Sequence, residues 1–132
     1  MTTVGQSLGA ALALLESIFL RPQLPTTISV KFVGYGLPRV GNQAWANIVD
    51  ARLSGDVTHI NNKKYTAPIV PEMFLGYHRP SGEINIEQSG DWVECPGQDN
   101  SDKLCIVGVV PTIFSGDTND HDGPYNDIIF KC

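Results

Sequence analysis

The stretch Gly5-Gln6-Ser7-Leu8-Gly9 is the most informative part of this 132-residue sequence. It matches the pattern Gly-x-Ser-x-Gly, in which a serine occupies a sharp turn between a strand and a helix. Residues 2–4, Thr-Thr-Val, favour the end of a β-strand, and residues 8–20 are rich in Ala and Leu and apolar on nearly all sides, which is typical of a buried helix. Pro22 ends that helix. The sequence therefore predicts a strand–turn–helix unit with Ser7 at its bend.

Strands and helices alternate in the residues that follow. β-branched and aromatic residues predict a strand at residues 28–35. A helix is predicted at residues 42–53, with Asn42 as its N-cap, and a further strand at residues 56–61. This alternation is typical of parallel β-α units. The predicted class is α/β, with a mostly parallel sheet and flanking helices.

The chain changes character after residue 62. Residues 63–76 are expected to form a proline-containing loop, and residues 77–86 a hairpin around Arg79-Pro80-Ser81-Gly82. Beyond Gly90 the chain is rich in Gly, Asp and Asn, with one apolar island at residues 106–110. The C-terminal part is therefore predicted to be a hairpin and loop region.

Composition and charge exclude several classes of protein. Hydrophobic residues make up 42% of the sequence and charged residues 17%, which indicates a globular rather than a disordered chain. No apolar run reaches the roughly 18 residues that a transmembrane segment needs. The net charge of -5 argues against nucleic acid as a partner. The three cysteines lack the spacing of a zinc site, so neither a metal nor another cofactor is expected.

The cysteines instead indicate one disulfide and one leftover thiol. Cys95 and Cys105 lie in loop-like sequence at a spacing that fits a short disulfide loop, while Cys132 is left over. An odd cysteine in such a chain suggests that its partner lies elsewhere. The first residues carry no secretory signal, which taken alone indicates a cytosolic product. Because the cysteines indicate secretion, we expect an N-terminal part with a signal peptide and a fourth cysteine to be absent here.

The Gly-x-Ser-x-Gly turn has a specific chemical use. It presents the Ser7 hydroxyl above the edge of a sheet as a nucleophile, and Gly5 and Gly9 must be small so that the helix can cross close by. The backbone amide of Leu8 would point toward the reacting oxygen as one oxyanion donor. The structural alternative is a glycine-rich turn that merely precedes a buried helix.

A nucleophilic serine needs a histidine base and an acid that orients it. Of the three histidines, His59 lies in a predicted strand and is expected to be structural, and His78 lies in a hairpin arm and is expected to be exposed. His121 lies in a late polar loop, which is where this kind of fold carries its base. A solvated loop histidine is the alternative for His121.

Five stretches in this order resemble a known family: residues 4–13, residues 34–42 (Gly-Tyr-Gly-Leu-Pro-Arg-Val-Gly-Asn), and residues 57–62, 74–78 and 121–125. The chain resembles the fungal class 3 lipases, which are triacylglycerol-lipase-like α/β-hydrolases. The matches run from Val4 to Cys132 and correspond to the back half of a typical member. Residues 1–132 are therefore interpreted as the C-terminal part of a single α/β-hydrolase domain, a partial fold without its N-terminal part. The family's first oxyanion loop and its lid would belong to that missing part.

The resemblance assigns roles to individual residues. Ser7 is the nucleophile and His121 is the general base, while Cys132 is similar to the family's terminal cysteine. The catalytic aspartate is expected just ahead of a Pro-x-x-Pro spacing, where this chain has Tyr65. A tyrosine is neutral at pH 7 and cannot stabilise an imidazolium as a carboxylate does. Gln6 stands where the family usually has a histidine.

The resemblance implies two possible functions. The first is a secreted lipase-like hydrolase that transfers the acyl group of a triacylglycerol or related lipid ester to Ser7 and then to water. Such an enzyme would act at a lipid–water interface. The second is a catalytically inactive lipase-like fragment, because Tyr65 replaces the acid and the N-terminal half is absent. Such a fragment would at most bind a lipid or a partner. An unrelated binding module with a glycine-rich turn is a remote third interpretation.

Overall fold

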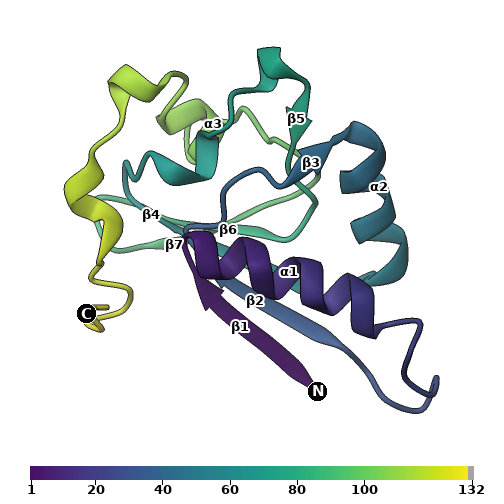
Figure 1. Cartoon of the computed structure of the whole chain (residues 1–132). Helices are drawn as coiled ribbons and strands as arrows, with labels where there is room; N and C mark the ends of the chain where they lie inside the picture. The colour runs from purple at the N-terminus through teal and green to yellow at the C-terminus, as the bar shows by residue number, and fades with distance from the viewer. Residues whose placement is uncertain (131–132) are drawn as a thin grey trace.

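A five-stranded sheet forms the centre of the computed structural model, which describes residues 1–130 (Figure 1). In sheet order its strands are β1 (Thr2–Gln6), β2 (Lys31–Tyr35), β4 (Val57–Asn62), β6 (Glu83–Ile86) and β7 (Trp92–Cys95). The first four strands run parallel to one another, and β7 runs antiparallel to β6. This arrangement confirms the predicted α/β class with a mostly parallel sheet.

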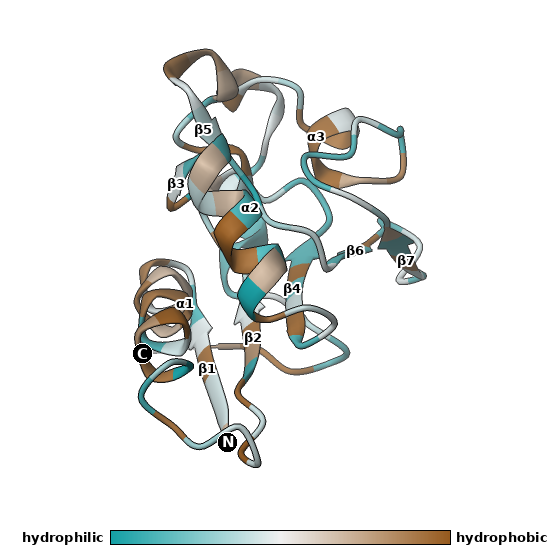
Figure 2. Ribbon diagram, turned by 90° about the vertical axis from the view of Figure 1, so that its right-hand side faces the viewer, coloured by the Kyte–Doolittle hydropathy of each residue, from teal (hydrophilic) through white to brown (hydrophobic). Residues whose placement is uncertain are grey.

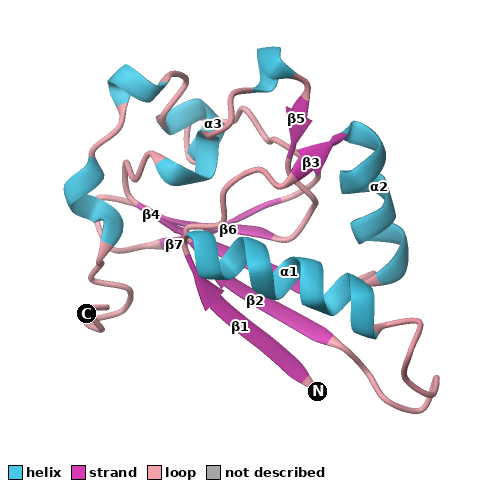
Figure 3. Cartoon of the chain, in the orientation of Figure 1, coloured by secondary structure: helices cyan, strands magenta, loops and turns pink. Residues whose placement is uncertain are grey.

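The remaining elements flank the sheet or follow it. The helices are α1 (Leu8–Leu20), α2 (Gln43–Arg52) and α3 (Ile106–Val109), and the short 3₁₀ helices are η1 (Ala67–Ile69), η2 (Met73–Leu75), η3 (Ile113–Ser115) and η4 (Thr118–His121). A small antiparallel sheet pairs β3 (Gly41–Asn42) with β5 (Tyr77–His78). Figure 3 shows that the later half of the chain consists mainly of short helices and loops. Among the described helices, none combines the length and hydropathy needed to cross a bilayer.

Most of the local predictions agree with the structure. Helix α1 has the predicted bounds, β2 is a shortened form of the strand expected at residues 28–35, and β4 is shifted by one residue from residues 56–61. The side chain of Asn42 accepts a hydrogen bond from the backbone amide of Trp45 at 3.0 Å, which confirms Asn42 as the N-cap of α2. The apolar island at residues 106–110 forms α3.

The predicted hairpin at residues 77–86 is wrong. Strand β5 pairs with β3, whereas β6 lies between β4 and β7 in the large sheet. The segment between β5 and β6 carries Arg79, whose side chain is fully buried, and the carbonyl of Pro80 lies 3.0 Å from Nε2 of His59. These long-range contacts hold β5 and β6 apart, so the two strands do not pair with each other. The hairpin of this region instead connects β6 to β7.

Two apolar layers cover the two faces of the sheet. On one face α1 and α2 pack against alternate residues of β2, and the buried members of this cluster include Ala10, Leu14, Phe32 and Val49. On the other face the C-terminal segment places Tyr125 and Phe130 against Ile60 and Ile86. Residues 32 and 33 of β2 join opposite clusters, as the alternation of a strand requires.

Helix α1 is covered on one face only. Figure 2 shows apolar residues on this helix both toward the sheet and away from it. Its outer face, which the structure leaves exposed, consists of Leu8, Leu12, Leu15 and Phe19. The expectation of a helix buried on nearly all sides therefore holds for the sheet-facing side alone. Strand β1 pairs with β2 and lies at the edge of the described sheet.

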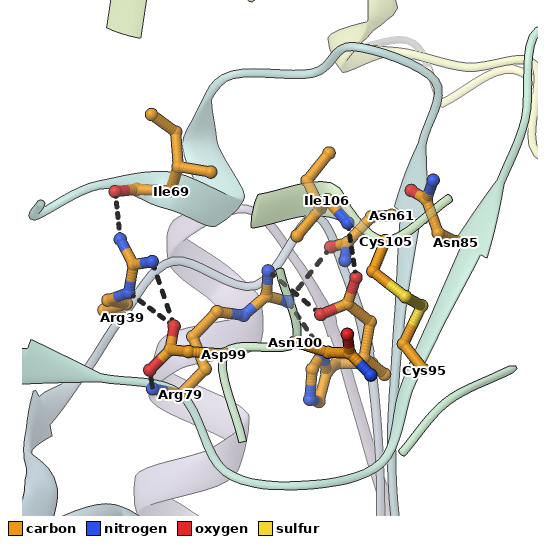
Figure 4. Close-up of polar contacts among 12 residues, drawn as sticks. Arg39, Asn61, Ile69, Arg79, Asn85, Cys95, Asp99, Asn100, Cys105 and Ile106 are labelled. Carbon is orange, nitrogen blue, oxygen red and sulfur yellow. Dashed lines mark hydrogen bonds and ion pairs between the residues drawn. A yellow bond between two sulfur atoms is a disulfide. The ribbon is translucent and has the colours of Figure 1, made fainter. Parts of the chain in front are cut away.

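A buried ion pair ties the loops beyond the sheet together (Figure 4). Asp99 lies in the loop that the Cys95–Cys105 disulfide closes, which confirms the predicted pairing; Cys132 lies outside the described residues. One carboxylate oxygen of Asp99 is 2.9 Å from both Nε and Nη2 of Arg39. Its other oxygen accepts the backbone amide of Arg79 at 3.0 Å. Asp99 thus joins the disulfide loop to two distant segments.

A second group of contacts continues from Arg79 into the sheet. Nη2 of Arg79 donates to Nδ1 of His59 at 2.7 Å and to Oδ1 of Asn61 at 3.2 Å, and Glu83 lies 3.7 Å from Nη1. Burial, together with the charge of Arg79, lowers the pKa of His59 well below its usual value, so its ring is neutral. Its Nδ1 can therefore accept from Arg79 while Nε2 donates to Pro80. His59 is a structural residue, as expected.

We expect Asp99→Ala to lower the free energy of unfolding by about 3–5 kcal/mol, because it leaves the buried Arg39 guanidinium without its carboxylate. Asp91→Ala is the matched control, since Asp91 is an exposed carboxylate in the turn between β6 and β7, and it should change stability by less than about 0.5 kcal/mol. Urea denaturation of both variants measures the difference. Equal effects of the two substitutions would show that the ion pair does not hold these loops.

Candidate active site

Ser7 occupies a strained turn between β1 and α1. Its backbone has φ 53° and ψ -125°, in the positive-φ region that residues with a side chain rarely adopt. The Ser7 amide donates to the carbonyl of Tyr35 at 2.8 Å, and the Ser7 carbonyl accepts the amide of Ala10 at 3.0 Å. These two bonds connect the turn to β2 and to the first turn of α1. The geometry agrees with the strand–turn–helix unit that the motif predicts.

The two glycines of the motif have different environments. A Cβ atom at Gly5 would lie 2.2 Å from the carbonyl oxygen of Gly9 and 2.6 Å from the amide nitrogen of Ala10. A Cβ atom at Gly9 would have no neighbour within 4 Å. The close crossing of helix over strand therefore requires glycine at position 5. The expectation that Gly9 must also be small is not supported by the contacts of the described residues.

Tyr65 and His121 lie beside Ser7. The Tyr65 hydroxyl is 3.3 Å from Oγ of Ser7 and forms a hydrogen bond with Nδ1 of His121. The two rings pack edge to face, with their centroids 4.9 Å apart. Tyr65 is only 5% exposed, and this burial raises the pKa of its hydroxyl. The phenol therefore keeps its proton at neutral pH.

His121 is held by contacts from both ends of the chain. Its carbonyl accepts a hydrogen bond from Nε2 of Gln6 at 3.0 Å, and its own Nε2 lies 3.8 Å from a carboxylate oxygen of Asp122. The neighbouring carbonyl of Asp120 accepts from Nδ2 of Asn62 at 3.1 Å. Within the described residues no hydrogen bond connects Ser7 directly to His121. The positioning contact of Gln6 was not predicted, because nothing local in the sequence indicates it.

Leu8 lies directly after Ser7, whereas two of the three histidines lie outside this group. Leu8 begins α1, so its amide belongs to the first turn, where N–H groups lack an intrahelical acceptor. The remaining histidines lie elsewhere: His59 is buried next to Arg79, and Nδ1 of the partly exposed His78 is 3.1 Å from Asp99. Of the three histidines, only His121 contacts the Ser7 region.

The described residues offer no arrangement that argues for a metal. Glu83, Cys95 and Cys105 form the one cluster of potential ligand atoms that lie within 4.8 Å of one another in this part of the chain. Both sulfur atoms belong to the disulfide, and a carboxylate oxygen of Glu83 accepts the amide of Ile106 at 2.7 Å. These groups already form a disulfide and a hydrogen bond, so they are not free to bind a metal.

Known proteins share both the sequence and the fold. A family model described as lipase (class 3) matches residues 1–75. A secreted mono- and diacylglycerol lipase of Malassezia globosa is 34% identical over 127 residues, which are 95% of this chain and 40% of that protein. A secreted mono- and diacylglycerol lipase of Malassezia restricta is 35% identical over 127 residues, which are 38% of that protein. This chain thus spans about two-fifths of the length of these curated relatives.

Solved structures agree with the sequence matches. Lipase II from Rhizopus niveus superimposes with a TM-score of 0.80 and 29% identity, over 97% of this chain and 47% of that chain. A triacylglycerol lipase described as having a serine protease triad in its catalytic centre superimposes with a TM-score of 0.77 and 28% identity, over 92% and 45% of the two chains. The fold described above is therefore that of a lipase α/β-hydrolase.

Gly5→Ala and Gly9→Ala should have opposite effects on stability. The new methyl group of Gly5→Ala would overlap the backbone of Gly9, so we expect a loss of at least about 2 kcal/mol, within the range of overpacked sites. Gly9→Ala adds a methyl group in open space within a helix and should stabilise by up to about 1 kcal/mol. Thermal unfolding of the two variants measures both. A destabilised Gly9→Ala protein would contradict the assignment of the close contact to Gly5 alone.

Proposed function

Because this chain belongs to the class 3 lipase family, we propose that it carries the acyl-transfer residues of a lipid-ester hydrolase, with Ser7 as nucleophile and His121 as general base. The single observation that carries the proposal is the strained turn at Ser7, which holds the hydroxyl at the carboxyl end of the sheet, 3.3 Å from the Tyr65 hydroxyl that contacts His121. The relatives named as secreted mono- and diacylglycerol lipases support an acylglycerol ester as the substrate class and secretion as the localisation.

The proposed reaction follows the chemistry of serine esterases. Oγ of Ser7 attacks the ester carbonyl and forms an acyl-enzyme, and His121 takes up the serine proton and returns it to the leaving alcohol. The amide of Leu8 donates to the developing oxyanion. Water then releases the fatty acid by the same steps in reverse order.

We also propose that residues 1–132 form the C-terminal part of a single lipase domain. The coverage of 38–47% of the relatives and of the solved lipase supports an assignment to part of such a domain. A second oxyanion donor and a lid over the site would then be supplied by the remainder of that domain. A lipid–water interface is the surrounding in which such a domain would act.

A specific observation favours a second candidate, an inactive lipase-like protein. Tyr65, at the position expected for the acid, presents an uncharged hydroxyl to His121. A carboxylate at this position would stabilise the imidazolium that forms during acyl transfer, and a neutral phenol does so far less well. On this alternative the chain keeps the scaffold and at most binds a lipid or a protein partner.

Labelling with a fluorophosphonate and hydrolysis of a p-nitrophenyl butyrate ester test the proposed function. We expect the whole chain to be labelled at Ser7 and to hydrolyse the ester, and Ser7→Ala to abolish both. Ser89→Ala is the matched control, because Ser89 is an exposed serine in the turn between β6 and β7. A chain that is neither labelled nor active, under conditions in which it unfolds cooperatively, would favour the inactive alternative.

If His121 takes the serine proton directly, Tyr65→Asp should raise kcat on a short-chain ester by about 10- to 100-fold, because loss of the acid in other triads costs about 10⁴ and a carboxylate should recover part of it. Tyr65→Asn is the matched control, since it has the same shape as the aspartate variant without its charge, and it should give no gain. An equal gain in both variants would show that the space left by the phenol matters rather than the charge.

A further inference from the structure

We propose that Tyr65 is a proton relay between Ser7 and His121, so that the serine proton reaches the histidine through the phenol hydroxyl. This inference rests on the proposed function and adds a catalytic role for the residue that replaces the acid. It is carried by the position of one oxygen atom. The Tyr65 hydroxyl contacts Oγ of Ser7 on one side and Nδ1 of His121 on the other.

The partners of the two ring nitrogens of His121 favour such a relay. In a Ser-His-Asp triad Nε2 faces the serine and Nδ1 faces the acid. Here Nδ1 of His121 faces the Tyr65 hydroxyl, and Nε2 faces the carboxylate of Asp122 at 3.8 Å. The hydrogen-bonded path from Ser7 to His121 therefore runs through the phenol oxygen.

The phenol is held firmly in this position. The Tyr65 amide donates to the carbonyl of Asn62 at 2.9 Å, directly after β4. Its ring lies against Gly36, where a Cβ atom would come within 2.5 Å of the ring carbon Cε1. Gly36 has a φ of +60°, so the absence of a side chain serves both the turn and the ring. The hydroxyl is thus placed by packing at the end of β4 and by its hydrogen bonds to Ser7 and His121.

The relay balances without an added reactant. As Oγ of Ser7 forms its bond to the carbonyl carbon, its proton passes to the oxygen of Tyr65, and the proton of Tyr65 passes to Nδ1 of His121. When the ester C–O bond breaks, the imidazolium returns its proton to Tyr65, and Tyr65 gives its own proton to the leaving alkoxide. Water repeats both transfers in deacylation. Tyr65 ends each half-reaction in its starting state.

The environment supports a shuttle rather than a phenolate base. Burial raises the pKa of Tyr65, so the hydroxyl carries a proton to pass on while its oxygen accepts another. Asp122 is a positioning residue in this scheme, because it faces the nitrogen of the imidazolium that is remote from the reaction. Its side chain is 53% exposed, so its contribution is that of a surface ion pair.

The test compares two variants that each remove only a buried hydroxyl. We expect Tyr65→Phe to slow the labelling of Ser7 by a fluorophosphonate about 10²- to 10⁴-fold, the usual effect of losing general acid–base assistance. Tyr125→Phe is the matched control, because the Tyr125 hydroxyl is buried nearby and has no hydrogen-bond partner among the described residues. It should label at the rate of the unmodified chain.

Asp122→Asn should slow labelling by about 2- to 5-fold, the range expected for an exposed ion pair. Asp127→Asn serves as its control, because Asp127 is exposed and adopts a positive φ that asparagine tolerates. A drop of the same size in both variants would remove Asp122 from the scheme.

Rates in mixtures of H₂O and D₂O provide a readout that a merely structural role would not change. A relay moves two protons in one step, so the labelling rate of the unmodified chain should curve downward with the deuterium fraction. The residual rate of Tyr65→Phe should instead fall linearly. This measurement on the unmodified chain decides the question even if Tyr65→Phe fails to fold.

The outcomes separate this inference from the proposed function. If the chain labels at Ser7 but Tyr65→Phe labels equally fast, or if the deuterium dependence is linear, the relay is overturned and Ser7 remains the nucleophile. If Tyr65→Phe labels faster, the phenol obstructs His121 and the relay is likewise overturned. If Ser7 is not labelled at all in the folded chain, the proposed function itself fails.

Discussion

The missing side chain at Gly5 determines how closely α1 can cross the carboxyl end of β1. The built Cβ contact of 2.2 Å with Gly9 leaves no room for any other residue there. Because the helix starts so close to the strand, Ser7 must turn within one residue and adopts a positive φ. The same crossing lays α1 across β2, where Ala10 and Leu14 join the cluster around Phe32. Both the position of the hydroxyl and the larger core cluster therefore depend on this contact.

Signals that act over a few residues could be predicted from the sequence, whereas contacts across the fold could not. The bounds of α1 and the cap at Asn42 depend on near neighbours, and both were predicted. The path of the chain around Arg79 depends on His59, Asn61 and Asp99, which lie about 20 residues away on either side. No local pattern reveals such a pairing, and so the false hairpin was predicted.

In the candidate site, too, some features could be predicted from the sequence and others depend on contacts across the fold. The carboxyl ends of parallel strands meet at one edge of a sheet, so a serine after β1 and a residue after β4 could be expected to come together. His121 was predicted as the base from its late polar loop and from the family resemblance. The contact between Gln6 and the His121 carbonyl spans 115 residues and involves a backbone atom, so side-chain patterns carry no trace of it. The orientation of the imidazole ring likewise depends on packing around Tyr65 that only the structure reveals.

Two ion pairs of this chain differ in how far water reaches them. Arg39 and Asp99 form an ion pair that is almost wholly shielded from water, while Asp122, next to the candidate base, is about half exposed. Ions in solution screen exposed charges strongly and buried ones weakly. On the proposed chemistry, the imidazolium of His121 would be supported by a charge that dissolved salt can weaken. The turnover of this site should thus depend on ionic strength, whereas the scaffold that holds it should be nearly indifferent to salt.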